Sequence, residues 1–409
     1  MSNHTQQFSE EFVRLALAIN EHSPGYVDAY FGPEEWAKAA EQGGKLPLPE
    51  LEERAEQLAL HVSQASDLDE QRKDFLVHQL CAMQMSLRLL MGEEVSLAEE
   101  VQALYDVVPA WKDESIFMDI QKELDQMLPG AGPVKERLER WNKSLELSME
   151  SIRELLPVVT DRLRELTNEM FPLPAGEAFR VEFVSDQPWM AYNLYQGEYQ
   201  SIIEVNTDLP IRVNGLVELL AHEGYPGHHT ELCLKELNLI RQKNDQEHVL
   251  TLINSPAAVI AEGIATTALE TILAEAELED WYRKEILPRA GMPHIDAARM
   301  IAIHRAERTL ETLSGNAAFM MYDQKKSPQE VKSYAQTYGL NTEQEADHLI
   351  RFISNPLDRS YIFTYFEGRE LLEELFSCGD RKQAFARLLT EPVTPSQIRQ
   401  WIENESRNR

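Results

Sequence analysis

Apolar residues recur at the three- and four-residue spacing of an α-helix along most of this 409-residue chain. The first helical stripe is formed by Phe8, Phe12, Leu15 and Ile19. Residues 49–66 and 71–91 continue the pattern with Leu, Ala, Glu, Gln and Met, which favour helices. From about residue 211 the pattern runs to the C-terminus, with breaks at prolines. These stripes predict a mainly α protein whose apolar faces form the core.

One segment departs from the helical pattern, at residues 178–206. The stretch AFRVEFV alternates apolar and polar residues, and EYQSIIEVN does so again after the connection QPWMAYNLYQG. We therefore expect two strands here, forming a small β-hairpin or part of a short sheet. EYQSIIEVN is also a candidate edge strand that could pair with an extended peptide.

The domain organisation is less strongly marked. The stretch PGAGP at 129–133 is the clearest interior break, and a helical pattern then runs to Pro157, where a kink is expected. We expect a helical N-terminal half over residues 1–170 and a half bearing the functional site over 171–409. The alternative is one continuous domain. A content of 43% hydrophobic and 26% charged residues is typical of a globular chain.

Charge and cysteine content restrict the partners and the compartment. A net charge of -30 repels phosphate backbones and anionic lipid, so nucleic acid and membranes are poor candidate partners. The N-terminal residues MSNHTQQFSEEF lack the basic and apolar regions of a signal peptide. Three widely spaced cysteines argue against a disulfide framework and favour the reducing cytoplasm.

The most unusual motif is HEGYPGHH at residues 222–229. In the zinc-hydrolase motif H-E-x-x-H, two histidines four residues apart share one helical face. Here His228 lies six residues after His222, which on a regular helix is about 9 Å along the axis and on another face. The segment is therefore either a loop that happens to contain histidines or a metal site with an insertion.

Pro226 and Gly227 favour the insertion. The proline ring would clash with the carbonyl of His222, and glycine permits backbone angles closed to other residues. We expect the helix to bulge at 224–227 and loop out about two residues, which would return His228 to the place of the second histidine. Glu223 would then be the general base for the attacking water.

A second element supports a metal site. Glu262 lies in the apolar helical stretch AVIAEGIATTALE, where a buried carboxylate is costly unless it is paired or binds a metal. Gly263 next to it leaves room for another helix to approach. Glu262 is the candidate third ligand, and a capped or solvent-facing glutamate is the alternative.

HEGYPGHH, AEGIA and the element Tyr365-Phe-Glu-Gly368 together resemble the bacterial domain-of-unknown-function family marked by H-E-x-x-P-G-H-H. That family is related to the zincin-like peptidases and is similar in fold to the thermostable carboxypeptidase Taq family. The resemblance covers mainly residues 180–375. It implies a multi-helical zincin-like fold around a deep cleft, with His222, His228 and Glu262 in a gluzincin-type ligand set and Glu223 as base. The chain differs from the common family form at Thr230-Glu231 and at Ile264.

Other residues near these motifs could contact the substrate. His229 is either the second metal ligand, if the bulge takes one more residue, or a group that supports a ligand or contacts substrate. Tyr361, Tyr365 and Arg369 recur at spacings of four and can share one helical face. Tyr365 is the candidate oxyanion donor, and Arg359 and Arg369 are candidates to bind a substrate carboxylate.

The favoured function is a zinc-dependent metallohydrolase with one metal ion, acting as a peptidase on short peptides. Other divalent transition metals suit the same ligands. Cleavage from the carboxyl end is implied by the resemblance alone. An amidase or esterase acting on a small metabolite would use the same chemistry. The third hypothesis is a zincin-fold binding protein without catalytic activity, which holds if His222 and His228 cannot approach one another.

Overall fold

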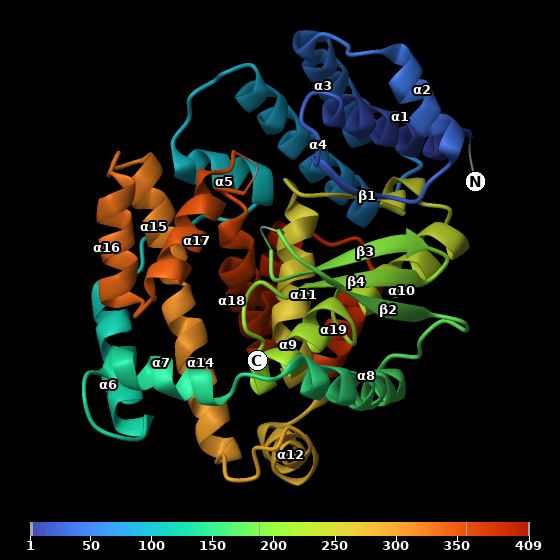
Figure 1. Cartoon of the computed structure of the whole chain (residues 1–409). Helices are drawn as coiled ribbons and strands as arrows, with labels where there is room; N and C mark the ends of the chain where they lie inside the picture. Colours follow the sequence, from blue (N-terminus) through green and yellow to red (C-terminus); the bar gives the residue numbers. More distant parts are fainter. Residues whose placement is uncertain (1–2, 188, 357, 408–409) are drawn as a thin grey trace.

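The computed structural model describes residues 3–187, 189–356 and 358–407. It is mostly helical, as the apolar spacing predicts, and has two small sheets (Figure 1). The N-terminal elements are α1 (Asn3–Asn20), β1 (Val27–Tyr30), α2 (Glu34–Gly43), α3 (Leu48–Gln64), α4 (Glu70–Leu90), α5 (Leu97–Tyr105), α6 (Glu114–Met127), α7 (Val134–Ser144) and α8 (Met149–Met170). The single helical pattern expected up to Pro157 is therefore two helices, and α8 continues through that proline.

The central elements carry the motifs. They are β2 (Ala178–Val184), β3 (Ala191–Gly197), β4 (Gln200–Asn206), α9 (Val213–Glu223), α10 (His228–Lys235), β5 (Leu250–Leu252) and α11 (Pro256–Ile272). The remaining helices are α12 (Glu275–Trp281), α13 (Leu287–Arg289), α14 (Ala297–Glu311), α15 (Leu313–Tyr322), α16 (Pro328–Tyr338), α17 (Glu343–Ser354), α18 (Ile362–Cys378), α19 (Arg381–Thr390) and α20 (Pro395–Arg407).

The sheet at 178–206 differs from the expected hairpin. Its order is β2-β4-β3, with β4 parallel to β2 and antiparallel to β3. The segment read as a connection therefore contains a third strand, β3. Residues 200–206 of the stretch EYQSIIEVN form β4, and Glu198 and Tyr199 form the turn before it. Because β4 is paired on both sides, it cannot be the peptide-binding edge proposed for it. In β4 the side chains of Ile203 and Val205 are buried, which accounts for the alternation in the sequence.

A second sheet links distant parts of the chain. Strand β1 pairs with β5 in antiparallel register, and Ala29 lies opposite Thr251. The sequence shows no strand signal at either place, because both strands are very short. β5 leads directly into α11, a central helix that is buried on almost every side. The pairing therefore fixes the N-terminal part of the chain beside the helix that carries Glu262.

The hydrophobic clusters each combine residues from distant parts of the chain. One large cluster extends from Phe117 through α7, α8 and α9 to Ile402. A smaller one joins residues between Phe12 and Leu87 with Val249, Leu250 and Leu252. The core contributed by residues 117–171 is thus continuous with that of the site-bearing part of the chain.

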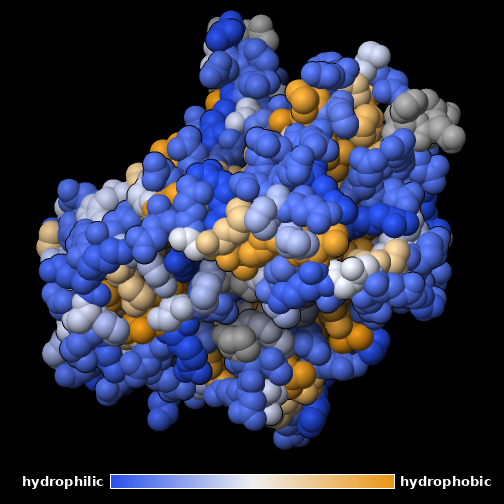
Figure 2. Space-filling view, turned by 90° about the horizontal axis from the view of Figure 1, so that it is seen from above, coloured by the Kyte–Doolittle hydropathy of each residue, from blue (hydrophilic) through white to orange (hydrophobic). Residues whose placement is uncertain are grey.

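The surface is rich in hydrophilic residues (Figure 2), in agreement with the content of 26% charged residues. Seen from above, the molecule is covered mainly by hydrophilic residues, with hydrophobic residues in small separate patches (Figure 2). In the described residues no single helix is long and apolar enough to cross a membrane. The segments Pro256–Ile272 and Glu275–Arg289 together are long and apolar enough to span a membrane, but they are bent by 76° relative to one another.

Candidate metal centre

The HEGYPGHH segment joins two helices. α9 ends at Glu223 and α10 begins at His228, so the expected single bulged helix is in fact interrupted. The amide of Gly227 donates to the carbonyl of Ala221 at 2.9 Å, and the amide of Thr230 donates to that of Gly224 at 3.3 Å. Each bond spans six residues where a helix spans four. The prediction that two residues are inserted is therefore confirmed.

Glycine is required at the start of α10 because the backbones approach closely. A Cβ atom on residue 227 would lie 1.8 Å from the carbonyl oxygen of His222 and 2.5 Å from that of Ala221. No side chain can be accommodated at these distances. The preceding peptide bond, Tyr225–Pro226, is cis. The local sequence thus folds the chain back so that His228 approaches His222.

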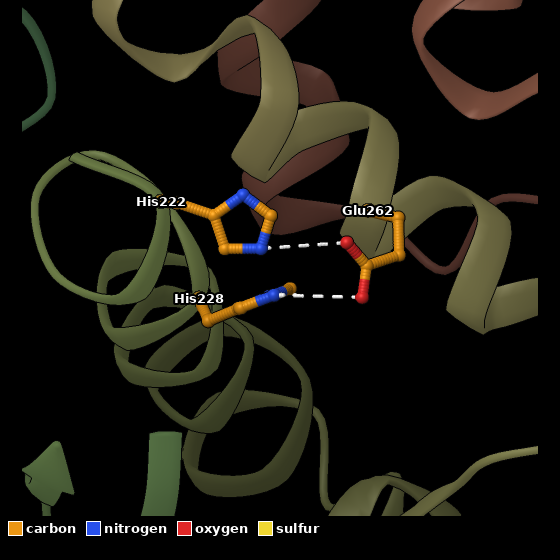
Figure 3. A group of neighbouring side chains, drawn as sticks. All are labelled: His222, His228 and Glu262. Atoms are coloured by element: carbon orange, nitrogen blue, oxygen red, sulfur yellow. Dashed lines mark ion pairs between the residues drawn. The ribbon is translucent and has the colours of Figure 1, made fainter. Parts of the chain in front are cut away.

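His222, His228 and Glu262 converge (Figure 3). One possible ligand atom from each lies within 4.8 Å of the others. The Nε2 atom of His222 is 3.4 Å from Oε2 of Glu262, and Nε2 of His228 is 3.8 Å from Oε1. The two imidazole rings are nearly perpendicular, with centroids 4.8 Å apart. These donors, two imidazoles and a carboxylate, are a set that zinc and related divalent metals prefer.

The burial and hydrogen bonding of the Glu262 carboxylate indicate that His222, His228 and Glu262 are suited to bind a cation. Its side chain is only 5% exposed. The Tyr361 hydroxyl donates to Oε1 at 2.6 Å, whereas Oε2 is buried and accepts no hydrogen bond in the described residues. A buried carboxylate oxygen without a well-formed hydrogen bond is costly, and a cation placed between it and the histidines would satisfy it.

Close helix packing holds Glu262 in place. A Cβ atom on Gly263 would lie 2.8 Å from the Gly368 carbonyl oxygen, and one on Gly368 would lie 2.4 Å from that of Val259. The backbones of α11 and α18 therefore touch at two glycines, which confirms the prediction that Gly263 admits another helix. This contact brings Tyr361, at the start of α18, within reach of Glu262.

Glu223 lies at the end of α9 beside the converging groups. Its Oε1 is 4.0 Å from Nε2 of His222, and the side chain is 9% exposed. Within the described ranges its carboxylate makes no hydrogen bond. Burial raises the pKa of Glu223, and the nearby histidines oppose this only in part. A buried carboxylate with a raised pKa and no fixed partner is suited to accept a proton.

Glu231 is a residue that the sequence reasoning treated only as a departure from the family pattern. It lies one turn after His228, buried, with its Oε2 3.9 Å from Nδ1 of that histidine. Lys235 donates to its Oε1 at 2.5 Å. Burial alone would lower the pKa of His228, but Glu231, Glu262 and Glu223 outweigh this and raise it to about 9. A carboxylate behind a ligating histidine is a common way to orient the ring.

His229 faces away from the converging groups. It is fully buried, with Nδ1 2.8 Å from the Ser201 hydroxyl and Nε2 3.1 Å from Oε2 of Glu177. Tyr225 donates to the same oxygen of Glu177, and Arg164 pairs with the other. The structure thus leaves His228, and not His229, beside His222. His229 instead anchors α10 to the sheet and to the segment that precedes it, through its contacts with Ser201 and Glu177.

The residues of the 359–369 segment separate into two groups. Tyr361 and Tyr365 lie at the site with ring centroids 5.5 Å apart, and the Tyr365 hydroxyl has no hydrogen-bond partner in the described residues. Burial raises the pKa of Tyr365 strongly, and the charges of Glu262 and Glu223 raise it further, so this hydroxyl stays protonated and can donate.

The two arginines differ from the expectation that they bind a substrate carboxylate. Arg359 makes a bidentate pair with the buried Glu100. Arg369 donates to the carbonyl of Thr266 and to Glu270 at 2.7 Å. Each guanidinium therefore already has carboxylate partners. Glu100 and Glu270 lie about 100 or more residues away and could not be found from the sequence, whereas Glu373, which also pairs with Arg369, lies one helical turn away.

Asp28, on strand β1, lies within electrostatic range of the site, and no sequence feature pointed to it. The Tyr192 hydroxyl donates to its Oδ1 at 2.6 Å. Its carboxylate interacts electrostatically with His228 and Glu262. It also contributes to the raised pKa of Glu223 and of Tyr365. These groups belong to four different helices or helix ends, so Asp28 lies within electrostatic range of all four.

Comparisons with known proteins give the fold alone. No protein-family profile matches the chain, and no curated protein matches its sequence. Among solved structures it is similar to a putative lipoprotein from Colwellia psychrerythraea, with a TM-score of 0.53 and 14% identity over 92% of this chain and 70% of that one. A putative lipoprotein of unknown function from Shewanella oneidensis has a TM-score of 0.48 and 10% identity over 89% and 75% of the two chains. An M32 carboxypeptidase from Deinococcus radiodurans R1 has a TM-score of 0.44 and 12% identity over 98% and 96%.

Proposed function

We propose that this protein is a zinc-dependent hydrolase that cleaves short peptides. The observation that supports it is the convergence of His222, His228 and Glu262, in which one buried oxygen of Glu262 has Nε2 of His222 at 3.4 Å and meets no hydrogen-bond criterion among the described residues. These three residues would hold the metal. When bound, a zinc ion supplies Lewis acidity, which makes a water molecule easier to deprotonate and polarises a carbonyl group.

The chain's own groups have separate parts in the reaction. Glu223 accepts the proton of the attacking water and passes it to the leaving amine. Tyr365 donates a hydrogen bond to the oxygen on which negative charge develops. Tyr361 orients the Glu262 carboxylate, and Glu231 orients the His228 ring.

The function is tested by metal content and hydrolysis measured together. We expect the purified protein to bind one zinc ion by elemental analysis and to cleave peptides of two to five residues. Glu223→Gln should keep the metal and reduce hydrolysis by roughly 100-fold or more. Glu218→Gln is the matched control, because Glu218 lies on the same helix but its carboxylate contacts His304 and Arg308 instead.

Each remaining hypothesis has its own outcome. Full peptidase activity in Glu223→Gln would refute the assigned base. Cleavage of acyl amides or esters but of no peptide would identify a small-molecule hydrolase, and bound zinc without any turnover would identify a binding protein. Failure to bind a divalent metal would overturn the proposal. We place the protein in the cytoplasm, a proposal that subcellular fractionation tests.

A further inference from the structure

The carboxylates around the candidate metal centre differ in the cations that balance them. Glu262 faces His222 and His228, and Glu231 is paired with Lys235. Glu223 has His222 within 4.0 Å. Asp28 differs from all of these, because no cationic side chain lies within ion-pair distance of it in the described residues.

The partners of Asp28 are neutral hydroxyl groups. Tyr192 donates to Oδ1 at 2.6 Å, and the Thr251 hydroxyl lies 3.4 Å from Oδ2. Thr251 lies on β5, opposite the strand that carries Asp28, and Tyr192 lies on β3. Two short strands and the edge of the sheet thus fix the direction of this carboxylate. Such a group is prepared to receive a cation, since little ordering remains to be done.

The environment of Asp28 increases the need for a counter-charge. The residue is partly buried, and burial raises the pKa of its carboxyl group above the ordinary value, although the hydroxyl of Tyr192 opposes the rise. A partly buried carboxylate without a positive partner is unfavourable. Arg359 and Arg369, the candidates for a substrate carboxylate, are already paired with Glu100 and Glu270. The site therefore provides one anionic acceptor, Asp28, whereas Arg359 and Arg369 are both already paired.

We infer that Asp28 binds an ammonium group of the substrate and thereby selects peptides that carry a positive charge beside the scissile bond. The ammonium is either the free amino terminus or a lysine side chain, since both offer the same three donors to a carboxylate. This inference rests on the proposed function for the position of the scissile bond. It gives Asp28 a role in substrate selection. The residues proposed to hold the metal and to act as general base stay the same.

The experiment compares three peptides on the full-length protein loaded with zinc. Ala-Ala-Ala has an α-ammonium group, acetyl-Ala-Ala-Ala has none, and acetyl-Ala-Lys-Ala has only the side-chain ammonium. We expect the wild type to prefer at least one charged peptide over the uncharged one by roughly 10- to 100-fold in kcat/KM, through KM, as for a hydrogen bond between charged groups. The charged peptide that is preferred identifies the source of the ammonium.

Asp28→Asn should abolish that preference while zinc content stays unchanged. Asp106→Asn is the matched control: it removes the same charge from a partly buried aspartate that contacts Ser396 and Arg399. Equal kcat/KM for all three peptides in the wild type would overturn the inference and leave the proposed function intact. So would a preference that survives in Asp28→Asn.

Binding to the metal-free protein separates the two proposals. By titration calorimetry, the wild type should bind the preferred charged peptide more tightly than acetyl-Ala-Ala-Ala, and Asp28→Asn should not. If this difference is found but no peptide is cleaved by the zinc-loaded protein, the inference about the ammonium stands and the peptidase proposal fails. If binding shows no difference, Asp28 is not an ammonium acceptor.

Discussion

The contact between α11 and α18 can be tested by adding one methyl group. In Gly263→Ala the new Cβ would lie 2.8 Å from the carbonyl oxygen of Gly368 and 2.9 Å from Cδ1 of Leu372. The leucine methyl can rotate away, but the backbone oxygen cannot, so the two helices must separate by several tenths of an ångström. Overpacking of this kind costs about 1–3 kcal/mol. Alanine recovers roughly 0.5–1 kcal/mol through its higher helix propensity.

We therefore expect Gly263→Ala to lower the free energy of unfolding by about 1–2 kcal/mol, from the overpacking and propensity terms together. Urea denaturation followed by circular dichroism measures this. The matched control is Gly215→Ala on α9, where the nearest heavy atom would lie 3.9 Å from the new Cβ. That variant should be as stable as the wild type or more stable by up to about 1 kcal/mol.

The same substitution should weaken metal binding, because Glu262 lies on one of the separated helices and Tyr361 begins the other. Zinc affinity measured by competition with a chelator provides this second readout. A Gly263→Ala protein with unchanged stability and unchanged zinc affinity would refute the view that the two glycines set the spacing of the site.

Two further substitutions test the supporting groups. Tyr361→Phe removes the hydroxyl that donates to Glu262, so zinc affinity should fall by roughly 10- to 100-fold; Tyr322→Phe removes a hydroxyl bonded to a backbone carbonyl elsewhere and should leave zinc affinity unchanged. Burial alone would raise the pKa of Glu177, but hydrogen bonds, including one from Arg164, outweigh it and hold the pKa below the ordinary 4.5. The stability contributed by this carboxylate is therefore present above pH 4.5 and is lost as the pH falls through the lower folded-state pKa. Glu177→Gln should reduce the free energy of unfolding by about 1–3 kcal/mol at pH 7 and by less as the pH falls toward 3, as urea titrations at each pH would show; an equal loss at both pH values would contradict this assignment.

Much of the candidate centre could be predicted from local sequence. The Pro226–Gly227 pair indicated an insertion of two residues, because proline disfavours a regular helix and glycine alone tolerates the backbone contact with His222. Glu262 was recognisable because a carboxylate within an apolar helix needs a partner. The signal for Glu231 was also local, since it lies one helical turn after His228, but it was read only as a departure from the family pattern.

The rest depended on contacts between distant segments. Both His228 and His229 lie in the first turn of α10, and only the packing of that helix against the sheet turns one toward Glu262 and the other toward Glu177. Strand β3 also depended on such contacts. It was interpreted as a connection because its residues do not alternate clearly between apolar and polar, and only its pairing with β4 identifies it as a strand.

The sequence by itself determined the helical class and the departure from regular helical geometry at Pro226–Gly227, because helical spacing and proline–glycine geometry act over a few bonds. Tertiary structure decided that Arg359 and Arg369 are engaged by carboxylates from other helices and that Asp28 lies within electrostatic range of the site. Charge pairing and burial act through space, so the partners of a side chain are known only when the segments that carry them have been brought together.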